Sequence, residues 1–205
     1  MIKKTSPPRV GFDLDGVILY NPIRLGRPLV TGFKRFILKK PITHFTIPHT
    51  PTQKFIWSLL HKTSFFIAPG FNELRESVAR GDFEAYLITA RFDFLKPDLD
   101  RWLDRIDAPH LFKQVYYNQK NEQPHLYKQK IISSLNLDYY VEDNWDIVKN
   151  LAIKPGLTTK IFWIYNIFDR RIPYSLKAPT LKKAIELIKY QMIKVKKTNQ
   201  NSINI

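Results

Sequence analysis

Short apolar runs alternate along the chain with longer segments in which apolar residues recur at helical spacing. The runs are rich in Val, Ile, Phe and Tyr, are bounded by turn residues and are too short for helices. We therefore predict buried parallel strands at 9–14, 83–89, 112–118, 139–142 and 159–165. The spacing between them predicts helices at 70–80, 97–105, 126–135, 146–151 and 181–195. This alternation is typical of an α/β fold, a doubly wound, Rossmann-like parallel sheet of about five strands.

The alternation is interrupted once, by a segment that follows the first strand. Helical spacing at 29–40 and 52–61 flanks a proline-bearing stretch, so we interpret residues 21–69 as a small inserted helical cap. The core of the fold would then be made of two pieces of the chain, followed by a basic helix and a frayed polar tail. Core, cap and tail are expected at 1–20 with 70–180, at 21–69 and at 181–205, respectively.

The net charge of +15 is concentrated in two regions of the chain. Residues 16–72 hold eight Lys and Arg and no Asp or Glu, and residues 177–205 hold seven Lys and one Glu. Basic regions of this kind favour partners that carry phosphate, which include small phosphorylated substrates, nucleic acid and an anionic membrane surface. The alternative is that lysine only keeps the surface soluble. No obligate protein partner is inferred.

The composition also excludes several classes of site. Because the chain has no Cys, it cannot form a disulfide, a thiolate metal site or a cysteine nucleophile. No window approaches the roughly 20 apolar residues of a membrane-spanning helix. The first residues, MIKKTSPPR, lead directly into a strand rather than into the apolar segment of a secretory signal. We therefore expect a cytoplasmic protein.

The stretch VGFDLDGV ends the first predicted strand with two aspartates. Side chains two positions apart on a strand point to the same side, which aims Asp13 and Asp15 into one space. The carboxyl ends of parallel strands are where ligands bind in such sheets. Two crowded carboxylates repel unless a cation joins them, and a set of oxygen ligands suits Mg²⁺. Gly16 then allows the backbone to leave the strand sharply.

Other stretches place phosphate-binding groups where the same site needs them. The second predicted strand ends at Thr89, whose hydroxyl, together with the backbone of Ala90 and Arg91, suits a phosphate oxygen. Lys128, near the start of a predicted helix, can neutralise a phosphate or a group of carboxylates. Taken singly, each of these residues has an ordinary structural explanation.

The fourth predicted strand ends in an acidic pair, Glu142 and Asp143, with Asp146 close by. An isolated pair of this kind is usually a surface turn. Here it supplies a second strand end with carboxylates, so the sequence predicts one acidic cluster built from the first and fourth strands.

Together these stretches resemble the motifs of the haloacid dehalogenase superfamily of phosphohydrolases. Those motifs are an apolar strand ending in DxDG, a strand ending in Thr or Ser, a helix lysine and an acidic strand end. The resemblance covers about residues 8–175, and finer features such as LITAR, VYYN, VEDN and the position of the cap look like the nucleotidase branch. The heavily basic cap and the lysine-rich tail depart from that branch. The matching positions are Asp13, Asp15, Thr89, Lys128 and Asp143.

The resemblance implies a mechanism and a cofactor. Asp13 would be the nucleophile that forms an aspartyl-phosphate, and Asp15 would act as general acid and then as general base. Mg²⁺ would be held by Asp13, by the backbone carbonyl of Asp15 and by Asp143. Because displacement of a halide needs no acid, Asp15 favours phosphatase over dehalogenase chemistry.

The remaining roles concern charge on the phosphoryl group and the surrounding loop. Thr89 and Lys128 would stabilise the transferring phosphoryl group, and Ala90 and Arg91 would help to bind the substrate. Glu142 or Asp146 could orient a metal-bound water, and Asn144 could fix the loop.

We interpret the protein as a magnesium-dependent phosphomonoester hydrolase that acts on a nucleotide or another small phosphorylated metabolite. One alternative is a phosphatase for nucleic-acid ends or for a lipid phosphate, docked by the basic cap. Another is a binding module for a phosphate ligand that no longer turns over. The aromatic residues of the cap could stack on bases or form the cap's own core, and the basic, amphipathic stretch FKRFILKK could lie on an anionic membrane.

Overall fold

The computed structural model describes residues 6–20, 45, 47–64 and 66–201, with the side chains of 196–201 excepted. The predicted cap helix at 29–40 lies outside these residues. No helix in the described part is long and apolar enough to cross a membrane.

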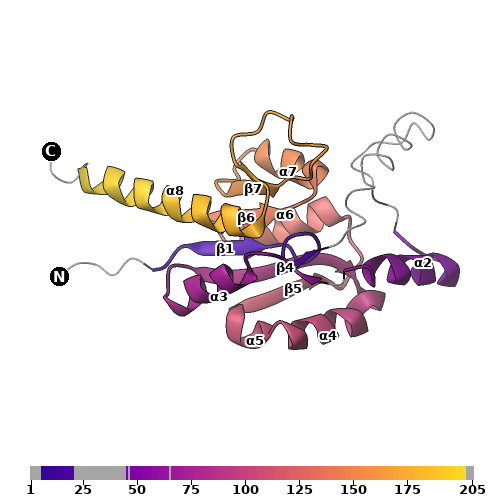
Figure 1. Cartoon of the computed structure of the whole chain (residues 1–205). Coiled ribbons are helices and arrows are strands. Elements are labelled where there is room, and N and C mark those ends of the chain that lie inside the picture. The colour runs from indigo at the N-terminus through magenta and orange to yellow at the C-terminus, as the bar shows by residue number, and fades with distance from the viewer. Residues whose placement is uncertain (1–5, 21–44, 46, 65, 202–205) are drawn as a thin grey trace.

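A six-stranded parallel sheet forms the centre of the molecule (Figure 1), in the order β5-β4-β1-β6-β7-β8. The predicted doubly wound, Rossmann-like fold is therefore confirmed, with six strands rather than about five. The sixth strand has only two residues, too few to show any hydrophobic period along the sequence. The strands are β1 (Arg9–Phe12), β4 (Glu84–Phe92), β5 (Gln114–Asn118), β6 (Tyr139–Glu142), β7 (Lys160–Ile164) and β8 (Lys177–Ala178).

The strand order reverses between β1 and β6. The chain builds the sheet outward from β1 through β4 to β5, and then continues on the other side of β1 with β6, β7 and β8. β1 and β6 lie side by side, and Phe12 pairs with Val141. Connections that leave two such strands run to opposite faces of the sheet, so a crevice opens at their carboxyl ends. Asp13 and Asp143 immediately follow these two strands.

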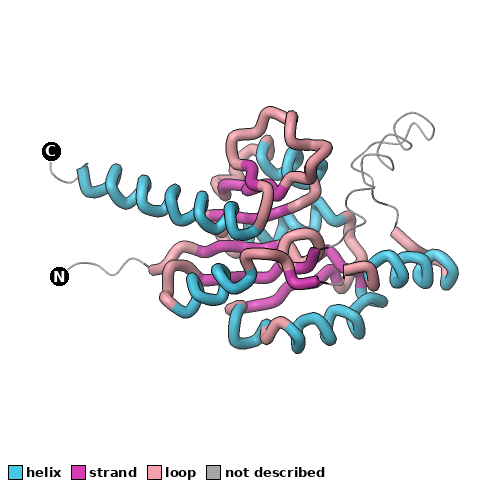
Figure 2. Tube along the Cα trace, in the orientation of Figure 1, coloured by secondary structure: helices cyan, strands magenta, loops and turns pink. Residues whose placement is uncertain are grey.

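Helices cover both faces of the sheet (Figure 2). Most of them lie close to the predicted ranges, whereas the single-turn segments α5 and η2 were not predicted because neither is long enough for a periodic pattern. The elements are α3 (Phe71–Ala79), η2 (Asp93–Leu95), α4 (Lys96–Arg105), α5 (Ala108–Leu111), α6 (Pro124–Ser134), α7 (Trp145–Ala152) and α8 (Leu181–Asn201).

Residues of the strands belong to two separate apolar cores, one on each face of the sheet. Val10 and Phe12 of β1 belong to the core that includes α3, α4, α5 and α8. Ile88 of β4 and Tyr140 of β6 belong to the core on the opposite face, which includes α6 and α7. Burial on both faces explains why the strands have nearly continuous apolar sequences.

The described part of the insertion consists of a hairpin and one helix. β2 (Leu19–Tyr20) pairs antiparallel with β3 (Phe66–Ile67), so the insertion leaves and rejoins the core at neighbouring points. The helix α2 (Pro51–His61) is capped at Thr50, whose hydroxyl accepts the N–H of Gln53 at 3.2 Å, while the Gln53 side chain accepts the N–H of Thr50. Figure 1 shows α2 extending away from the sheet.

The C-terminal helix α8 is packed against the body of the fold. Leu181, Ala184 and Ile185 are buried in the same core as β1. Gly70, just before α3, lies so close to α8 that a Cβ at this position would be 2.2 Å from the backbone nitrogen of Lys182. The φ angle of Gly70 is +105°, so any other residue here would be strained as well as crowded. The division into core, cap and tail stays a prediction.

Candidate active site

A pocket of about 190 Å³ lies at the carboxyl ends of β1, β4 and β6, where the strand order reverses. It is lined by groups from strand ends, from α6 and from the insertion. Its lining contains the predicted catalytic, substrate-binding and metal-binding residues Asp13, Asp15, Thr89, Ala90, Arg91, Lys128 and Asp143, whereas Asp146 does not line it. The fold therefore brings these seven residues together around one pocket.

Lys128 joins the carboxylates that follow β1 and β6. Its Nζ lies 2.8 Å from Oδ2 of Asp13 and 2.6 Å from Oε2 of Glu142, and all three side chains are buried. The lysine reaches them from the first turns of α6, which packs on β4 and so points this residue at the switch point. Asp13 is fixed further by the N–H of Leu14, which donates to its Oδ1 at 2.8 Å.

The electrostatics of this group are those of a crowded acidic site with one cation. Burial raises the pKa of Asp13 well above its ordinary value, and Glu142 adds to the effect, although Lys128 opposes both. For Lys128, burial alone would lower the pKa, but the contacts with Asp13 and Glu142 outweigh it and raise the pKa. The site therefore holds a lysine that is charged at neutral pH and an aspartate whose negative charge is poorly compensated.

Glu142 is a structural partner of the lysine in this arrangement. Besides Lys128, its Oε2 accepts the hydroxyl of Tyr140 at 3.2 Å, and its Oε1 accepts the N–H groups of Asp143 and Asn144 at 3.2 and 3.0 Å. These donors engage both carboxylate oxygens, so Glu142 positions Lys128 and the loop. Orientation of a metal-bound water by Glu142 stays a hypothesis. Tyr140 was missed by sequence reasoning because a tyrosine within an apolar strand has no distinctive signal.

Asp15 has a different environment from Asp13. Nε and Nη2 of Arg91 donate to its two carboxylate oxygens at 2.8 and 2.7 Å, and Nη1 of Arg91 donates to Asp98 at 2.7 Å. Burial alone would raise the pKa of Asp15, but the Arg91 guanidinium holds it well below the ordinary value. Arg91 lies at the site as predicted, but its side chain faces two carboxylates, and no sequence pattern pointed to Asp98.

Two residues of the insertion also reach Asp15. Oγ of Ser64 donates to Oδ1 at 3.2 Å, and Nδ1 of His61 lies 3.6 Å from Oδ2. A single histidine at the end of the predicted helix 52–61 has no spacing pattern that marks it as part of a site. Its contact arises because α2 ends beside the pocket, which no local pattern specifies.

Thr89 lies at an irregularity in β4. Its hydroxyl oxygen accepts the N–H of Arg91 at 3.3 Å, and the pairing of β4 with β5 shifts register between Thr89 and Phe92. A bulge of this kind turns backbone groups and side chains toward an adjacent site. It also carries β4 through Phe92, beyond the predicted strand end at Thr89.

The loop after β6 is fixed from both sides. The indole N–H of Trp163 donates to the carbonyl of Asp143 at 3.2 Å, and Asn144 caps α7 by accepting the N–H of Asp146 at 3.0 Å. The capping role of Asn144 agrees with the expectation that it fixes the loop. Asp146 sits in the first turn of α7, where a negative charge is favourable.

The acidic residues fit a divalent cation that prefers oxygen ligands. Asp13, Glu142 and Asp143 each offer a carboxylate oxygen, and these atoms lie within 4.8 Å of one another. Because Glu142 is engaged by four donors, Asp13 and Asp143 are the carboxylates best placed to bind an ion. A cation there would relieve the repulsion that raises the pKa of Asp13.

The lining of this pocket also includes apolar and aromatic side chains. Phe45 and Trp57 of the insertion, Phe92 and Pro124 line it. The backbone of Phe45 is held by Gln123, whose side chain accepts its N–H and donates to its carbonyl, both at 3.1 Å. The insertion therefore supplies an aromatic wall to the site.

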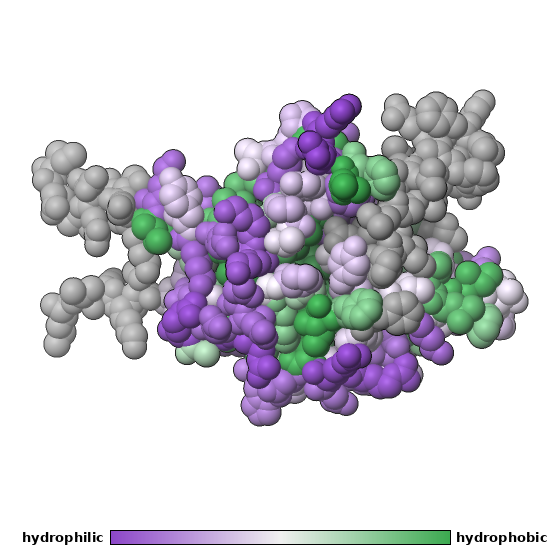
Figure 3. Space-filling view, viewed as in Figure 1, coloured by the Kyte–Doolittle hydropathy of each residue, from purple (hydrophilic) through white to green (hydrophobic). Residues whose placement is uncertain are grey.

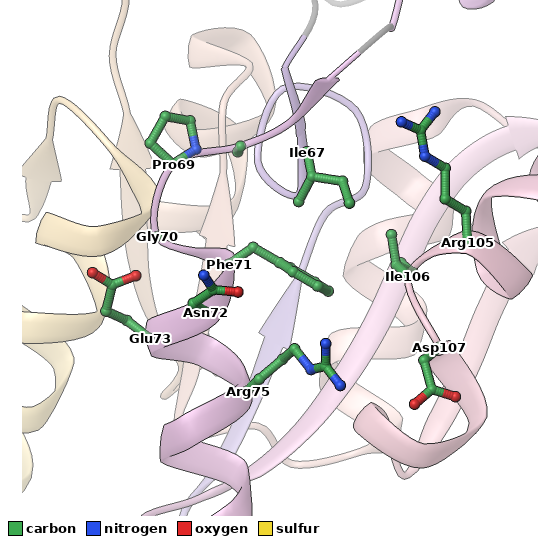
Figure 4. Close-up of a pocket in the computed structure, with 11 residues that line it drawn as sticks. Ile67, Pro69, Gly70, Phe71, Asn72, Glu73, Arg75, Arg105, Ile106 and Asp107 are labelled. Atoms are coloured by element: carbon green, nitrogen blue, oxygen red, sulfur yellow. The ribbon is translucent and has the colours of Figure 1, made fainter.

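A larger pocket, of about 370 Å³, lies between the start of α3 and the turn from α4 to α5 (Figure 4). Phe71 and Ile106 face each other across it, and Arg75, Arg105 and Asp107 lie around it. The two arginines and Asp107 are exposed, and none of the predicted site residues lines this pocket. It offers no buried nucleophile or acidic cluster, so the pocket at the switch point is the candidate active site.

Comparison with known proteins bears on the fold. No family model matches the chain, and no curated protein matches it in sequence. Among solved structures, a candidate β-phosphoglucomutase from Thermotoga maritima superposes with a TM-score of 0.54 and 14% identity, over 89% of this chain and 99% of that one. The chain has the fold of the haloacid dehalogenase-like hydrolases.

Two further solved structures are also similar in fold to this chain. A haloacid dehalogenase-like hydrolase candidate from Bacteroides fragilis gives a TM-score of 0.53 at 12% identity, over 86% of this chain and 98% of that one. A hydrolase of the same superfamily from Ehrlichia chaffeensis gives 0.50 at 12% identity, over 93% and 100%. The resemblance to the nucleotidase branch stays a prediction.

Proposed function

We propose that the protein is a magnesium-dependent phosphomonoester hydrolase that works through an aspartyl-phosphate. The observation that carries the proposal is the contact of Asp13 with Lys128 at 2.8 Å, inside a cluster of carboxylates at the switch point of the sheet. A buried aspartate beside both a fixed cation and a divalent-cation site is suited to attack a phosphate, whose negative charge would otherwise repel it.

The proposed reaction has two steps. An oxygen of Asp13 forms a bond to phosphorus while the ester P–O bond breaks, and the leaving oxygen takes a proton. Water then attacks the phosphorus of the aspartyl-phosphate, gives up a proton and releases phosphate, which restores Asp13. Bound Mg²⁺, held by Asp13, Asp143 and the carbonyl of Asp15, would neutralise charge on the phosphate oxygens. Lys128 and Thr89 would also stabilise charge on the transferring phosphoryl group.

We propose that Asp15 donates the proton in the first step and accepts a proton in the second. Its contact with Arg91 favours the carboxylate form, which suits the second step, because a carboxylate can take a proton from the attacking water. Its role as acid in the first step requires that it take up a proton against that contact. Substrates whose leaving oxygen needs little protonation should therefore react fastest.

The proposed substrate is a nucleotide or another small phosphorylated metabolite. The pocket, at about 190 Å³, is smaller than the roughly 300 Å³ at which sites for drug-sized ligands begin. Its two buried cations, Lys128 and Arg91, already contact carboxylates, which favours a single phosphate over a polyphosphate. The wall that contains Phe45 and Trp57 suits an apolar or planar leaving group.

The test is release of phosphate from a panel of phosphate esters, including p-nitrophenyl phosphate, with and without Mg²⁺. Wild-type protein should hydrolyse at least one ester only when Mg²⁺ is present. Asp13→Asn should abolish the activity and retain the fold, whereas Lys130→Met, on the exposed side of α6, should leave it unchanged. Wild-type protein that is inert on the whole panel would favour a binding module for a phosphate ligand.

A further inference from the structure

Arg91 is a buried arginine that joins two carboxylates. Its side chain is 1% exposed, and its Nε and Nη2 donate to Asp15 at 2.8 and 2.7 Å. The remaining nitrogen of the guanidinium, Nη1, donates to Oδ2 of Asp98 at 2.7 Å. Asp98 does not line the pocket, so any effect that it has on the chemistry passes through Arg91.

The contacts of Asp98 continue to the surface of the molecule. Its second oxygen, Oδ1, accepts Nη2 of Arg101 at 2.7 Å. The side chain of Asp98 is 15% exposed, and that of Arg101 is 67% exposed. Figure 3 shows hydrophilic residues along the lower edge of the molecule, where α4 lies. Four side chains of alternating charge therefore run from the pocket to solvent, namely Asp15, Arg91, Asp98 and Arg101.

Asp98 is a fixed point because the start of α4 is fixed. Pro97 lies in the first turn of α4, where the ring of a proline favours the helical backbone, and Asp98 follows it. A negative charge is favourable in the first turn of a helix. The inner side of α4 is anchored by Leu99 and Trp102, which are buried in the same core as β1. Asp98 is therefore held in place by the packing of its helix and not by Arg91 alone.

The contact with Asp98 gives the guanidinium of Arg91 a single orientation. The group is planar, and its N–H donors form a rigid fork. The edge formed by Nε and Nη2 faces Asp15, so an acceptor at Nη1 fixes the other end of the fork. A buried donor without an acceptor is costly, and Asp98 supplies the acceptor that Asp15 cannot. Without Asp98, Arg91 and the carboxylate that it holds would be free to shift.

The insertion contacts Asp15 as well, but over longer distances. Oγ of Ser64 lies 3.2 Å from Oδ1 of Asp15, and Nδ1 of His61 lies 3.6 Å from Oδ2. The corresponding distances from Arg91 are 2.7 and 2.8 Å. Because Arg91 is part of β4 and Asp98 is part of α4, the direction of Asp15 is set chiefly from outside the insertion.

We propose that Asp98 is a positioning residue for proton transfer by Asp15, and that it acts through Arg91. The role rests on the proposed function, in which Asp15 protonates the leaving oxygen. A displacement of about 1 Å from the reactive geometry can cost about a hundredfold in rate. Loss of Asp98 should therefore weaken proton transfer, whereas Lys128, which holds Asp13, stays in place. The loss should be largest for esters whose leaving oxygen most needs a proton.

The experiment compares two esters that share an aromatic ring, phenyl phosphate and p-nitrophenyl phosphate, at saturating Mg²⁺. The leaving oxygen of phenyl phosphate is the more basic, so its release depends more strongly on an acid. Asp98→Asn keeps the shape of the side chain and removes its charge. It should lower kcat/KM about tenfold on phenyl phosphate but only about threefold on p-nitrophenyl phosphate. The inhibition constant of inorganic phosphate should change by less than about twofold, because the groups that bind phosphate are unaltered.

Two further variants make the result specific. Asp100→Asn removes a charge from the same helix, at a side chain that is 48% exposed and pairs with Lys96 at 2.6 Å, and should behave like wild type on both esters. Asp98→Glu keeps the charge beside Arg91 and moves the carboxylate by one methylene group. It should show the same selective loss on phenyl phosphate. It also serves if Asp98→Asn fails to fold, because the buried guanidinium then keeps two anionic partners.

Several results would overturn the role of Asp98. An equal loss on the two esters in Asp98→Asn, or no loss, would show that the ion pair only ties α4 to β4. A selective loss of the same size in Asp100→Asn would assign the effect to the charge of α4 as a whole. A rise in the inhibition constant of phosphate as large as the loss on phenyl phosphate would place Asp98 in phosphate binding instead. Wild type that is inert on the whole panel of esters would refute the proposed function itself, whereas active wild type with an unselective Asp98→Asn would refute the positioning role alone.

Discussion

Replacing Lys128 by methionine keeps the approximate length of the side chain and removes the charge that joins β1 to β6. In the wild type, Nζ lies 2.8 Å from Asp13 and 2.6 Å from Glu142, and the lysine side chain is only 2% exposed. After the substitution, two buried carboxylates face each other without that cation. The free energy of unfolding should therefore fall.

The size of the loss follows from the partners that remain. Removing one partner of a buried ion pair costs about 3–5 kcal/mol. Glu142 keeps its bonds from Tyr140 and from two backbone N–H groups, and Asp13, whose pKa is already raised by burial and by Glu142, can become protonated. Both effects favour the lower end of this range of about 3–5 kcal/mol. We therefore expect the free energy of unfolding to fall by about 3 kcal/mol at pH 7, which corresponds to about 10 °C in Tm. The loss should shrink at pH 5, because Asp13 then binds a proton more readily.

The assay is urea unfolding of both proteins in the presence of a chelator, so that no divalent cation compensates for the lysine. Lys130→Met is the matched control, because Lys130 lies on the same helix, is 60% exposed and pairs with Glu122 at 3.3 Å. It should cost less than about 1 kcal/mol. Adding Asp13→Asn to Lys128→Met should recover about 1 kcal/mol or more, because one unpaired charge is removed. The reasoning is refuted if Lys128→Met costs no more than the control at pH 7, or if its loss grows between pH 7 and pH 5.

Four further outcomes are expected. With a chelator present, Asp13→Asn should raise the free energy of unfolding by about 1 kcal/mol at pH 7. The reason is that folding raises the pKa of Asp13, so the ionised carboxylate opposes folding. Urea unfolding near pH 3, where the carboxyl group is protonated in both states, should show no gain. Asp15→Asn should behave in the opposite way. Because folding lowers the pKa of Asp15, its carboxylate stabilises the fold fully above about pH 4, so the deficit of the variant in urea unfolding should be largest at pH 7 and should shrink as the pH falls below about 4. Tyr140→Phe should cost about 2 kcal/mol in the same assay, because Glu142 loses a buried donor, and a loss of under about 0.5 kcal/mol would contradict this. Arg91→Lys should lower kcat about tenfold with little change in KM, because an ammonium cannot make the two-pronged contact with Asp15. Steady-state kinetics on p-nitrophenyl phosphate measure both constants, and an unchanged kcat would contradict this expectation.

The strands and helices of the core could be predicted from the sequence because their signals are local. The strand at 139–142 agrees with β6, and the predicted helix at 97–105 differs from α4 by one residue. Burial of the sheet on both faces makes its strands apolar throughout, which separates them clearly from the amphipathic helices. β8 was missed because it is held by pairing with β7 and not by any pattern of its own.

The acidic strand ends and the lysine could also be placed together, because the carboxyl ends of parallel strands meet at one edge of the sheet. What could not be predicted is how the groups pair. Arg91 was read as part of a phosphate-binding strand end, but its side chain joins Asp15 to Asp98, which lies in the first turn of the following helix. His61 reaches the site only because of the path of the insertion. Such pairings depend on side-chain directions in three dimensions, which spacing along the chain does not encode.

The most direct test of the account is a crystal structure of the protein soaked with Mn²⁺, a divalent cation visible by its anomalous scattering, together with a phosphate analogue. The account predicts one strong peak bound by the carboxylates of Asp13 and Asp143, at roughly 2.0–2.3 Å, with the analogue between the ion and Lys128. Mn²⁺ bound elsewhere while Asp13 and Asp143 contact no ion would contradict it.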